Sequence, residues 1–142
     1  MKMQYHIEGA NFSAAGCASS EVKKTLKQFN IAPILVRRIA IVLYEAEMNV
    51  VAHAWRGTMS VDLTPEAIHV IVEDEGPGIE NIDKAMEEGF STASEKVRQM
   101  GFGAGMGLPN IRKNCDEMYL SSIPGIGTRL EINIYIGNFP AG

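Results

Sequence analysis

Residues 33–55 read PILVRRIAIVLYEAEMNVVAHAW, and this stretch predicts one long helix that begins at Pro33 and ends near Trp55. Proline suits the first position of a helix, because the N–H that it lacks has no intrahelical partner there. On a projection of about 100° per residue, the apolar positions form one stripe at roughly 60–160° from Glu45. They are Leu35, Ile39, Val42, Leu43, Ala46 and Val50. This face of the helix is expected to pack on a core.

Three polar residues of the same helix, Glu45, Asn49 and His53, recur at four-residue spacing and run into the edge of the apolar stripe. Burying an unpaired carboxylate is costly, so Glu45 requires a partner, a proton or a solvated cleft. Two interpretations stay open from this helix alone. The three residues either lie at the rim of the core with ordinary structural partners, or they face a functional cleft.

Two strands, at residues 57–63 and 67–74, are predicted on either side of a short turn. The second strand is the more apolar and is expected at the centre of the sheet. It leads into Asp74-Glu75-Gly76-Pro77-Gly78-Ile79. A fixed carboxylate followed by glycines lets the backbone approach a ligand closely. A tight turn with solvated acids is the alternative.

The run GFGAGMGL at residues 101–108 opens a predicted helix that ends near Cys115. Glycine at every second position lets successive N–H groups converge on an anion, and the dipole of the helix adds to the attraction. A flexible hinge is the alternative. A dinucleotide-binding GxGxxG motif is excluded because Met106 and Leu108 stand where glycine is needed. A phosphate loop of the GxxxxGK type is excluded because the chain has no Gly-Lys pair.

The remaining elements predicted are an edge strand at residues 3–9, a helix from Asn11 or Ser13 to Asn30, a short helix at residues 82–88, and a hairpin of residues 119–122 and 129–136. Helices and mostly antiparallel strands, without regular βαβ alternation, indicate an α+β protein built as a two-layer sandwich. No linker or repeat divides the chain, so residues 1–142 are expected to form a single domain.

The composition points to a globular protein. The 142 residues are 46% hydrophobic and 21% charged, which argues against disorder. A net charge of −4 gives no general attraction to nucleic acid or to anionic lipid. The two cysteines have no disulfide or zinc spacing. No segment resembles a membrane span or a signal peptide, so a cytoplasmic location is expected, with neither nucleic acid nor membrane as a direct partner.

Taken together, the motifs resemble the ATP-binding module of the gyrase, heat-shock chaperone, histidine kinase and MutL (GHKL) superfamily, the Bergerat fold. In chain order, the four matches are Glu45-Ala46-Glu47-Met48-Asn49, Asp74-x-Gly76-x-Gly78, Gly103-x-Gly105-x-Gly107 and Gly127-Thr128. They resemble the N box, the first and second glycine boxes and the late Gly-Thr pair. The resemblance covers nearly the whole chain and implies a mixed, mostly antiparallel sheet with helices on one face.

The resemblance implies ATP and Mg²⁺ as cofactors, and a role for each matching residue. Asn49 would be a ligand of Mg²⁺, and Glu45 would be the catalytic base that deprotonates an attacking hydroxyl. Asp74 would accept a hydrogen bond from the adenine amino group, with Thr128 beside it. The other residues implied in nucleotide binding are Gly76, Gly78, Ile79, Gly103, Gly105, Met106, Gly107 and Leu108.

Within the superfamily, the chain is most similar to bacterial anti-sigma factor and switch-protein serine/threonine kinases. The features that carry this similarity are the small size, the Glu45, Asn49 and His53 pattern, Phe90-Ser91-Thr92, and Gly107-Leu108-Pro109. The similarity implies a kinase that phosphorylates a small regulatory partner protein. The alternative is a non-catalytic, nucleotide-gated module that sequesters a sigma factor or another partner.

Two further expectations concern the lid and the histidines. Residues 90–103 are expected to be a mobile lid that orders around the γ-phosphate, and Arg98 is the arginine within it. None of His6, His53 and His69 lies on a separate dimerising helix, which disfavours an autophosphorylating sensor kinase. The direct role of His53 is left open between packing and support of the site.

Overall fold

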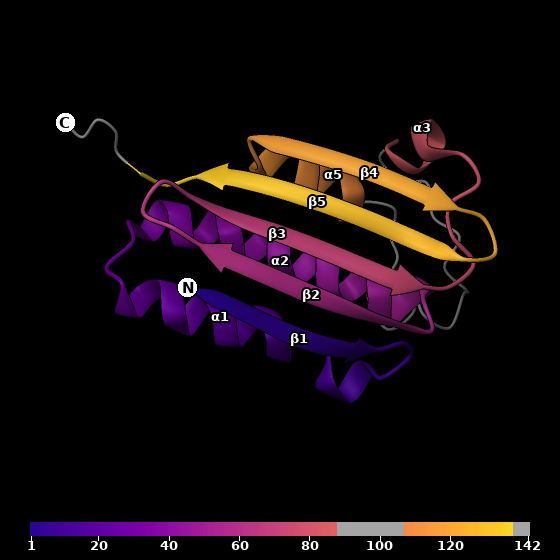
Figure 1. Ribbon diagram of the computed structural model, residues 1–142, viewed down its shortest axis with the longest axis horizontal. Helices are drawn as coiled ribbons and strands as arrows, with labels where there is room; N and C mark the ends of the chain where they lie inside the picture. Colours follow the sequence, from indigo (N-terminus) through magenta and orange to yellow (C-terminus); the bar gives the residue numbers. More distant parts are fainter. Residues whose placement is uncertain (88–106, 138–142) are drawn as a thin grey trace.

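The computed structural model describes residues 1–87 and 107–137. In this part of the chain, five strands form one sheet, in which every neighbouring pair is antiparallel. The order across the sheet is β1-β2-β3-β5-β4 (Figure 1). The strands are β1 (Lys2–Glu8), β2 (Arg56–Leu63), β3 (Ala67–Glu75), β4 (Glu117–Ile123) and β5 (Gly127–Tyr135). The expected edge position of β1 and the central position of β3 are both confirmed.

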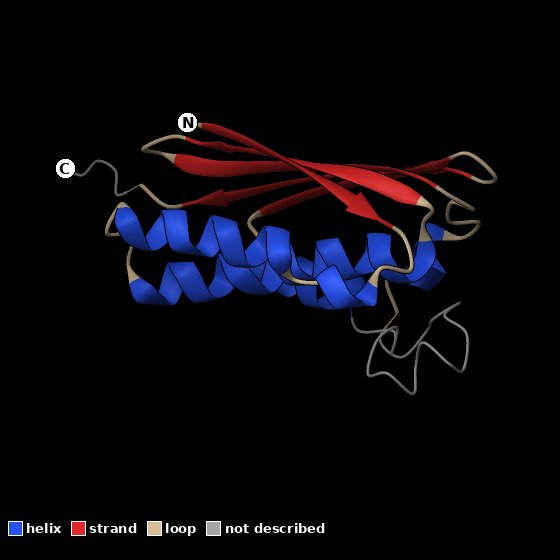
Figure 2. Ribbon diagram, turned by 90° about the horizontal axis from the view of Figure 1, so that it is seen from below, coloured by secondary structure: helices blue, strands red, loops and turns tan. Residues whose placement is uncertain are grey.

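The helices form a second layer on one face of the sheet, as Figure 2 shows. They are the 3₁₀ turn η1 (Phe12–Ala14) and the α-helices α1 (Cys17–Gln28), α2 (Pro33–His53), α3 (Ile82–Ala85) and α5 (Gly107–Asn114). Helix α2 contacts α1, α5 and strands β1 to β3, so it is the centre of the helical layer. The predicted two-layer α+β sandwich is confirmed. No helix in residues 1–87 or 107–137 is long and apolar enough to cross a membrane.

The core lies between the apolar stripe of α2 and the inward-facing residues of the central strands. Of the six positions predicted for the stripe, Leu35 is half-buried and the other five are buried. Alternate residues of β2, β3 and β5 face them, with Met59, Ile68 and Ile132 fully buried. Burying these side chains contributes about 1.5–3 kcal/mol each, so the packing of α2 on the sheet is a main source of stability.

The predicted start of the first helix, at Asn11 or Ser13, is wrong. Helix α1 begins at Cys17, after Gly16 in the left-handed region at φ 92°. Its cap comes from a distant part of the chain: the carboxylate of Glu47 on α2 accepts hydrogen bonds from the backbone N–H groups of Gly16, Ala18 and Ser19, at 3.0, 3.3 and 2.9 Å. Local capping patterns do not reveal a cap supplied from another helix.

Candidate functional site

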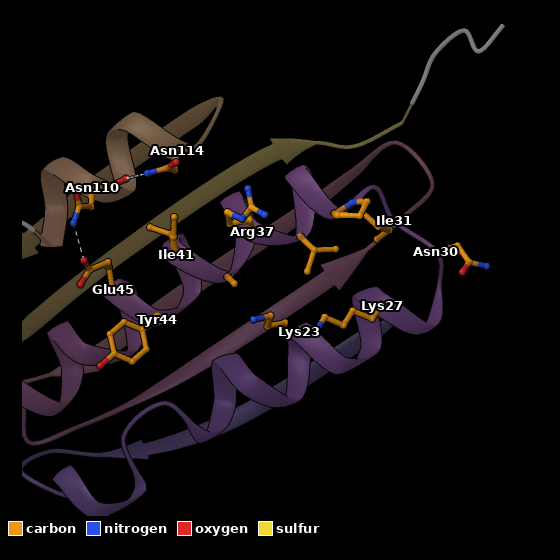
Figure 3. A pocket seen from close by; sticks show the side chains of 13 residues that line it. Lys23, Lys27, Asn30, Ile31, Arg37, Ile41, Tyr44, Glu45, Asn110 and Asn114 are labelled. Carbon is orange, nitrogen blue, oxygen red and sulfur yellow. Dashed lines mark hydrogen bonds between the residues drawn. The ribbon is translucent and has the colours of Figure 1, made fainter.

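The polar line predicted on α2 extends to the neighbouring helix α5. Asn110 of α5 donates a hydrogen bond from Nδ2 to Oε2 of Glu45 at 2.8 Å (Figure 3). Glu45 is half-buried, so one of its oxygens is held by a protein donor at the margin of the helical layer. The carboxylate therefore has the partner that its position in the sequence requires.

Asn49, one turn after Glu45, meets the start of α5. A Cβ atom added to Gly107 would lie 3.1 Å from Oδ1 of Asn49, so glycine at this position makes room for the asparagine side chain. Gly107 is the first residue of α5, where backbone N–H groups and the helix dipole favour negative charge. The fold thus brings together a hard oxygen donor from one motif and a helix N-terminus from another.

Asp74 lies near the end of β3, opposite Thr128 of β5 in the sheet register. Its Oδ1 accepts a hydrogen bond from the backbone N–H of Thr128 at 3.1 Å. Burial raises the pKa of Asp74, while the hydrogen bond from Thr128 acts in the opposite direction. The Asp74 carboxylate is half-buried, and this hydrogen bond joins it to β5, the strand that carries Thr128.

Ser122 of β4 joins this pair and was missed by the sequence patterns. Its Oγ accepts from the N–H of Ile79 at 2.7 Å, donates to the carbonyl of Gly127 at 3.0 Å, and lies 2.9 Å from Oγ1 of Thr128. A hydroxyl has one proton. When Ser122 gives this proton to the carbonyl of Gly127, Thr128 is the donor to Ser122 and keeps its lone pairs as acceptors. Asp74 and Thr128 then both have acceptor oxygens side by side, and their contact with a nucleotide stays a prediction.

The two glycines after Asp74 are required by the packing of the chain itself. A Cβ at Gly76 would lie 2.9 Å from Cα of Ala54, at the end of α2. Gly78 has φ +74°, and a Cβ there would lie 2.6 Å from the carbonyl oxygen of Ile123. This packing explains why both positions are glycine, and their contact with a nucleotide stays a prediction.

Two more of the predicted nucleotide-binding residues, Leu108 and Ile79, lie in the described part of the chain. Leu108 is buried in α5, and Ile79 is half-buried beside Ser122. Burial lowers the pKa of the His53 imidazole, which favours its neutral form at pH 7. Gly103, Gly105, Met106, Arg98 and the lid at residues 90–103 lie outside the described residues.

The donors present fit a magnesium ion that arrives with phosphate groups. Mg²⁺ retains several waters and binds one or two protein oxygens together with substrate phosphates. Oδ1 of Asn49 on α2, next to the start of α5, is an oxygen of this kind. Across residues 1–87 and 107–137, no group of three or more His, Cys, Asp or Glu side chains forms a metal cage. The side-chain oxygen of Asn49 beside a helix N-terminus fits Mg²⁺ that is bound together with phosphate groups.

Comparisons with known proteins agree with this chemistry. The family described as "Histidine kinase-, DNA gyrase B-, and HSP90-like ATPase" matches residues 35–137. The serine/threonine-protein kinase RsbT of Bacillus subtilis is 31% identical over 113 residues, which cover 77% of this chain and 79% of the relative. An anti-sigma F factor of Thermoanaerobacter sp. is 35% identical over 99 residues, 66% of each chain. That of Bacillus subtilis is 26% identical over 99% of this chain and 98% of its own.

Proposed function

Because the chain belongs to the histidine kinase-, DNA gyrase B- and HSP90-like ATPase family, we propose that it is an ATP-dependent serine/threonine kinase of the anti-sigma factor type. Membership implies the use of ATP. The relatives named as a serine/threonine-protein kinase and as anti-sigma F factors imply a regulatory protein partner. We propose more specifically that this partner is a small protein and that it carries the serine or threonine to which the phosphate is transferred. We also propose that residues 1–142 act as one cytoplasmic domain.

The observation that carries the proposal is the position of Glu45. Its carboxylate lies one helical turn before Asn49 on α2, and Asn110 holds one of its oxygens. Binding a nucleotide has no need of a carboxylate there, whereas activating a hydroxyl does. A hydroxyl is a weak nucleophile at neutral pH, and a positioned base accelerates transfer by about 10²–10⁴-fold.

Each described residue has a role in the proposed reaction. When bound, ATP supplies the phosphoryl group and Mg²⁺ neutralises charge on its phosphates. Asn49 holds the metal, and Glu45 takes the proton of the attacking hydroxyl. Asp74 accepts from the adenine amino group, with the acceptor oxygen of Thr128 beside it. Gly107 begins the helix whose N-terminus faces the phosphates, and Gly103, Gly105 and Met106 are proposed to complete that cradle.

The alternative is a nucleotide-gated module that binds and sequesters its partner without catalysis. The similarity to anti-sigma F factors favours this activity as a companion of the kinase activity. The kinase and the sequestering module differ in the role of Glu45. A kinase needs a base to remove the proton of the hydroxyl, whereas binding a partner does not. A variant at this residue therefore separates them.

The test is transfer of labelled γ-phosphate to purified regulatory proteins encoded beside this gene. With the wild type, we expect phosphate on a serine or threonine of one of them, located by mass spectrometry. Glu45→Gln should slow transfer by about 10²–10⁴-fold with ATP affinity nearly unchanged. Glu66→Gln, the same change in an exposed turn between β2 and β3, is the matched control. Full transfer by the Glu45 variant would contradict the kinase mechanism and leave the sequestering module.

A further inference from the structure

A groove of about 1010 Å³ runs along the outer side of the helical layer, between α1, α2 and α5. Figure 3 shows its course: Asn30 and Ile31 lie at one end, and Glu45 with its partner Asn110 lies at the other. The distance along α2 from Pro33 to Glu45 is about 18 Å at 1.5 Å per residue. We name this hollow the α1–α2–α5 groove.

The groove combines an apolar lining with positive charge. Ile41 and Tyr44 line it and are 38% and 43% exposed, so part of each apolar side chain is open to a ligand in the groove. Lys23, Lys27 and Arg37 are the cations among its lining residues, and Glu45 at its end is the carboxylate among them. The chain as a whole carries −4. The lining of the groove is therefore positively charged although the whole chain is negatively charged, and this favours an acidic ligand.

We propose that the α1–α2–α5 groove docks an acidic segment of the protein substrate and directs its serine or threonine to Glu45. The proposal rests on the proposed function, because Glu45 is its reference point. An extended segment rises about 3.3 Å per residue, so roughly five or six residues span the groove. Alternating acidic and apolar side chains would place carboxylates toward Lys23, Lys27 and Arg37, and apolar groups on Ile41 and Tyr44.

The probe is a fluorescein-labelled peptide with a central serine, flanked on each side by about six residues that alternate Glu and Leu. A second peptide carries Lys in place of every Glu. We expect the acidic peptide to bind the wild type, by fluorescence anisotropy, and the basic one not to bind. Raising the salt concentration should weaken the binding, because the attraction is between exposed charges.

Charge reversals locate the binding. Lys23→Glu, Lys27→Glu and Arg37→Glu should each raise the Kd of the acidic peptide by about three- to tenfold. Lys24→Glu is the matched control: it makes the same change on the same helix, is also exposed, and lies outside the groove lining. Equal losses in the control, equal binding of the two peptides, or no binding of the acidic one at millimolar concentration would overturn the proposal.

Failure of the groove and failure of the kinase are distinguishable. If purified partner protein is phosphorylated at the wild-type rate by all three groove variants, the groove proposal is wrong and the kinase stands. If the acidic peptide docks as expected but no protein or peptide is phosphorylated, the kinase proposal is wrong and docking stands. If the reversals change the sedimentation of the protein and leave peptide affinity unchanged, the groove holds a second copy of the chain, which also overturns the proposal.

Discussion

Glu45 and Glu47 lie on the same turn of α2 and differ in their surroundings. Glu47 is 2% exposed and satisfies three backbone N–H groups at the start of α1. Glu45 is half-buried, bonds to one side chain of α5 and faces the α1–α2–α5 groove. Glu47 therefore caps the start of α1, and Glu45 is the candidate base.

Glu47→Gln should destabilise the protein, because the amide keeps one acceptor oxygen and turns an NH₂ group toward backbone donors. Hydrogen bonds to charged groups are the strong ones, and leaving a buried donor unpaired is costly. We expect a loss of about 2–3 kcal/mol in the free energy of unfolding, measured with urea. Glu45→Gln is the control and should change stability by less than about 0.5 kcal/mol. Equal effects of the two variants would contradict the division of roles.

Asp74→Asn should raise stability and weaken nucleotide binding. Burial raises the pKa of Asp74 above its ordinary value of 3.8, so the native state holds this proton more tightly than the unfolded chain does. Protonation of Asp74 therefore raises the free energy of unfolding as the pH falls through the raised pKa. At pH 7 the carboxylate is ionised, and its burial lowers the stability of the native state. Asparagine removes that cost and keeps an oxygen for the N–H of Thr128.

The measurements for Asp74→Asn are thermal unfolding without ligand and calorimetric titration with ATP. We expect a higher Tm at pH 7 and a smaller difference from the wild type at acid pH. ATP affinity should fall by about 1–3 kcal/mol, because an amide group replaces a carboxylate acceptor. An unchanged ATP affinity would show that Asp74 does not hold the adenine.

At the scale of elements, the junction between β3 and the β4–β5 hairpin depends on close backbone contact. The N–H of Gly76 donates to the carbonyl of Ile126 at 3.0 Å, and the N–H of Gly125 donates to that of Pro77 at 2.7 Å. Gly78 packs on the carbonyl of Ile123. This junction keeps Ile79 within hydrogen-bonding distance of Ser122, and so supports the acceptor pair of Asp74 and Thr128.

Gly78→Ala tests the contact, and Gly125→Ala is its matched control. Both glycines have positive φ, at +74° and +81°, so alanine brings similar backbone strain at each. A Cβ at Gly125 meets nothing within 4 Å, whereas one at Gly78 overlaps the carbonyl of Ile123. Gly78→Ala should therefore cost about 1–3 kcal/mol more in urea unfolding. Equal costs would contradict the packing described for the junction.

Sequence patterns predicted the elements whose signals are local. The proline start and apolar stripe predicted the limits of α2 to within two residues, and the apolar run between two turn signals did the same for β3. The sequence patterns did not predict the start of α1 or the role of Ser122, because each depends on residues far away in the chain. Glu47 follows Ser19 by 28 residues, and Ser122 follows Ile79 by 43 residues.

At the scale of the whole molecule, the two layers bring three separate motifs into one neighbourhood. The second half of α2 carries Asn49, the start of α5 packs against it, and the end of β3 carries Asp74. The backbone ties these ends together, since Trp55 donates to the carbonyl of Glu75 at 2.8 Å directly after α2. Each motif can be recognised in the sequence, but the packing of the helices on the sheet is what brings the motifs together into one candidate site.

Calorimetric titration of the wild type and of Asn49→Ala with ATP tests whether these motifs form one Mg–ATP site. Each protein is titrated with and without Mg²⁺. We predict that Mg²⁺ tightens ATP binding to the wild type, and that Asn49→Ala removes most of this gain because the metal loses its protein oxygen. No binding of ATP at millimolar concentration would rule out the ATP site, and a gain from Mg²⁺ that persists in full without Asn49 would show that Asn49 does not hold the metal.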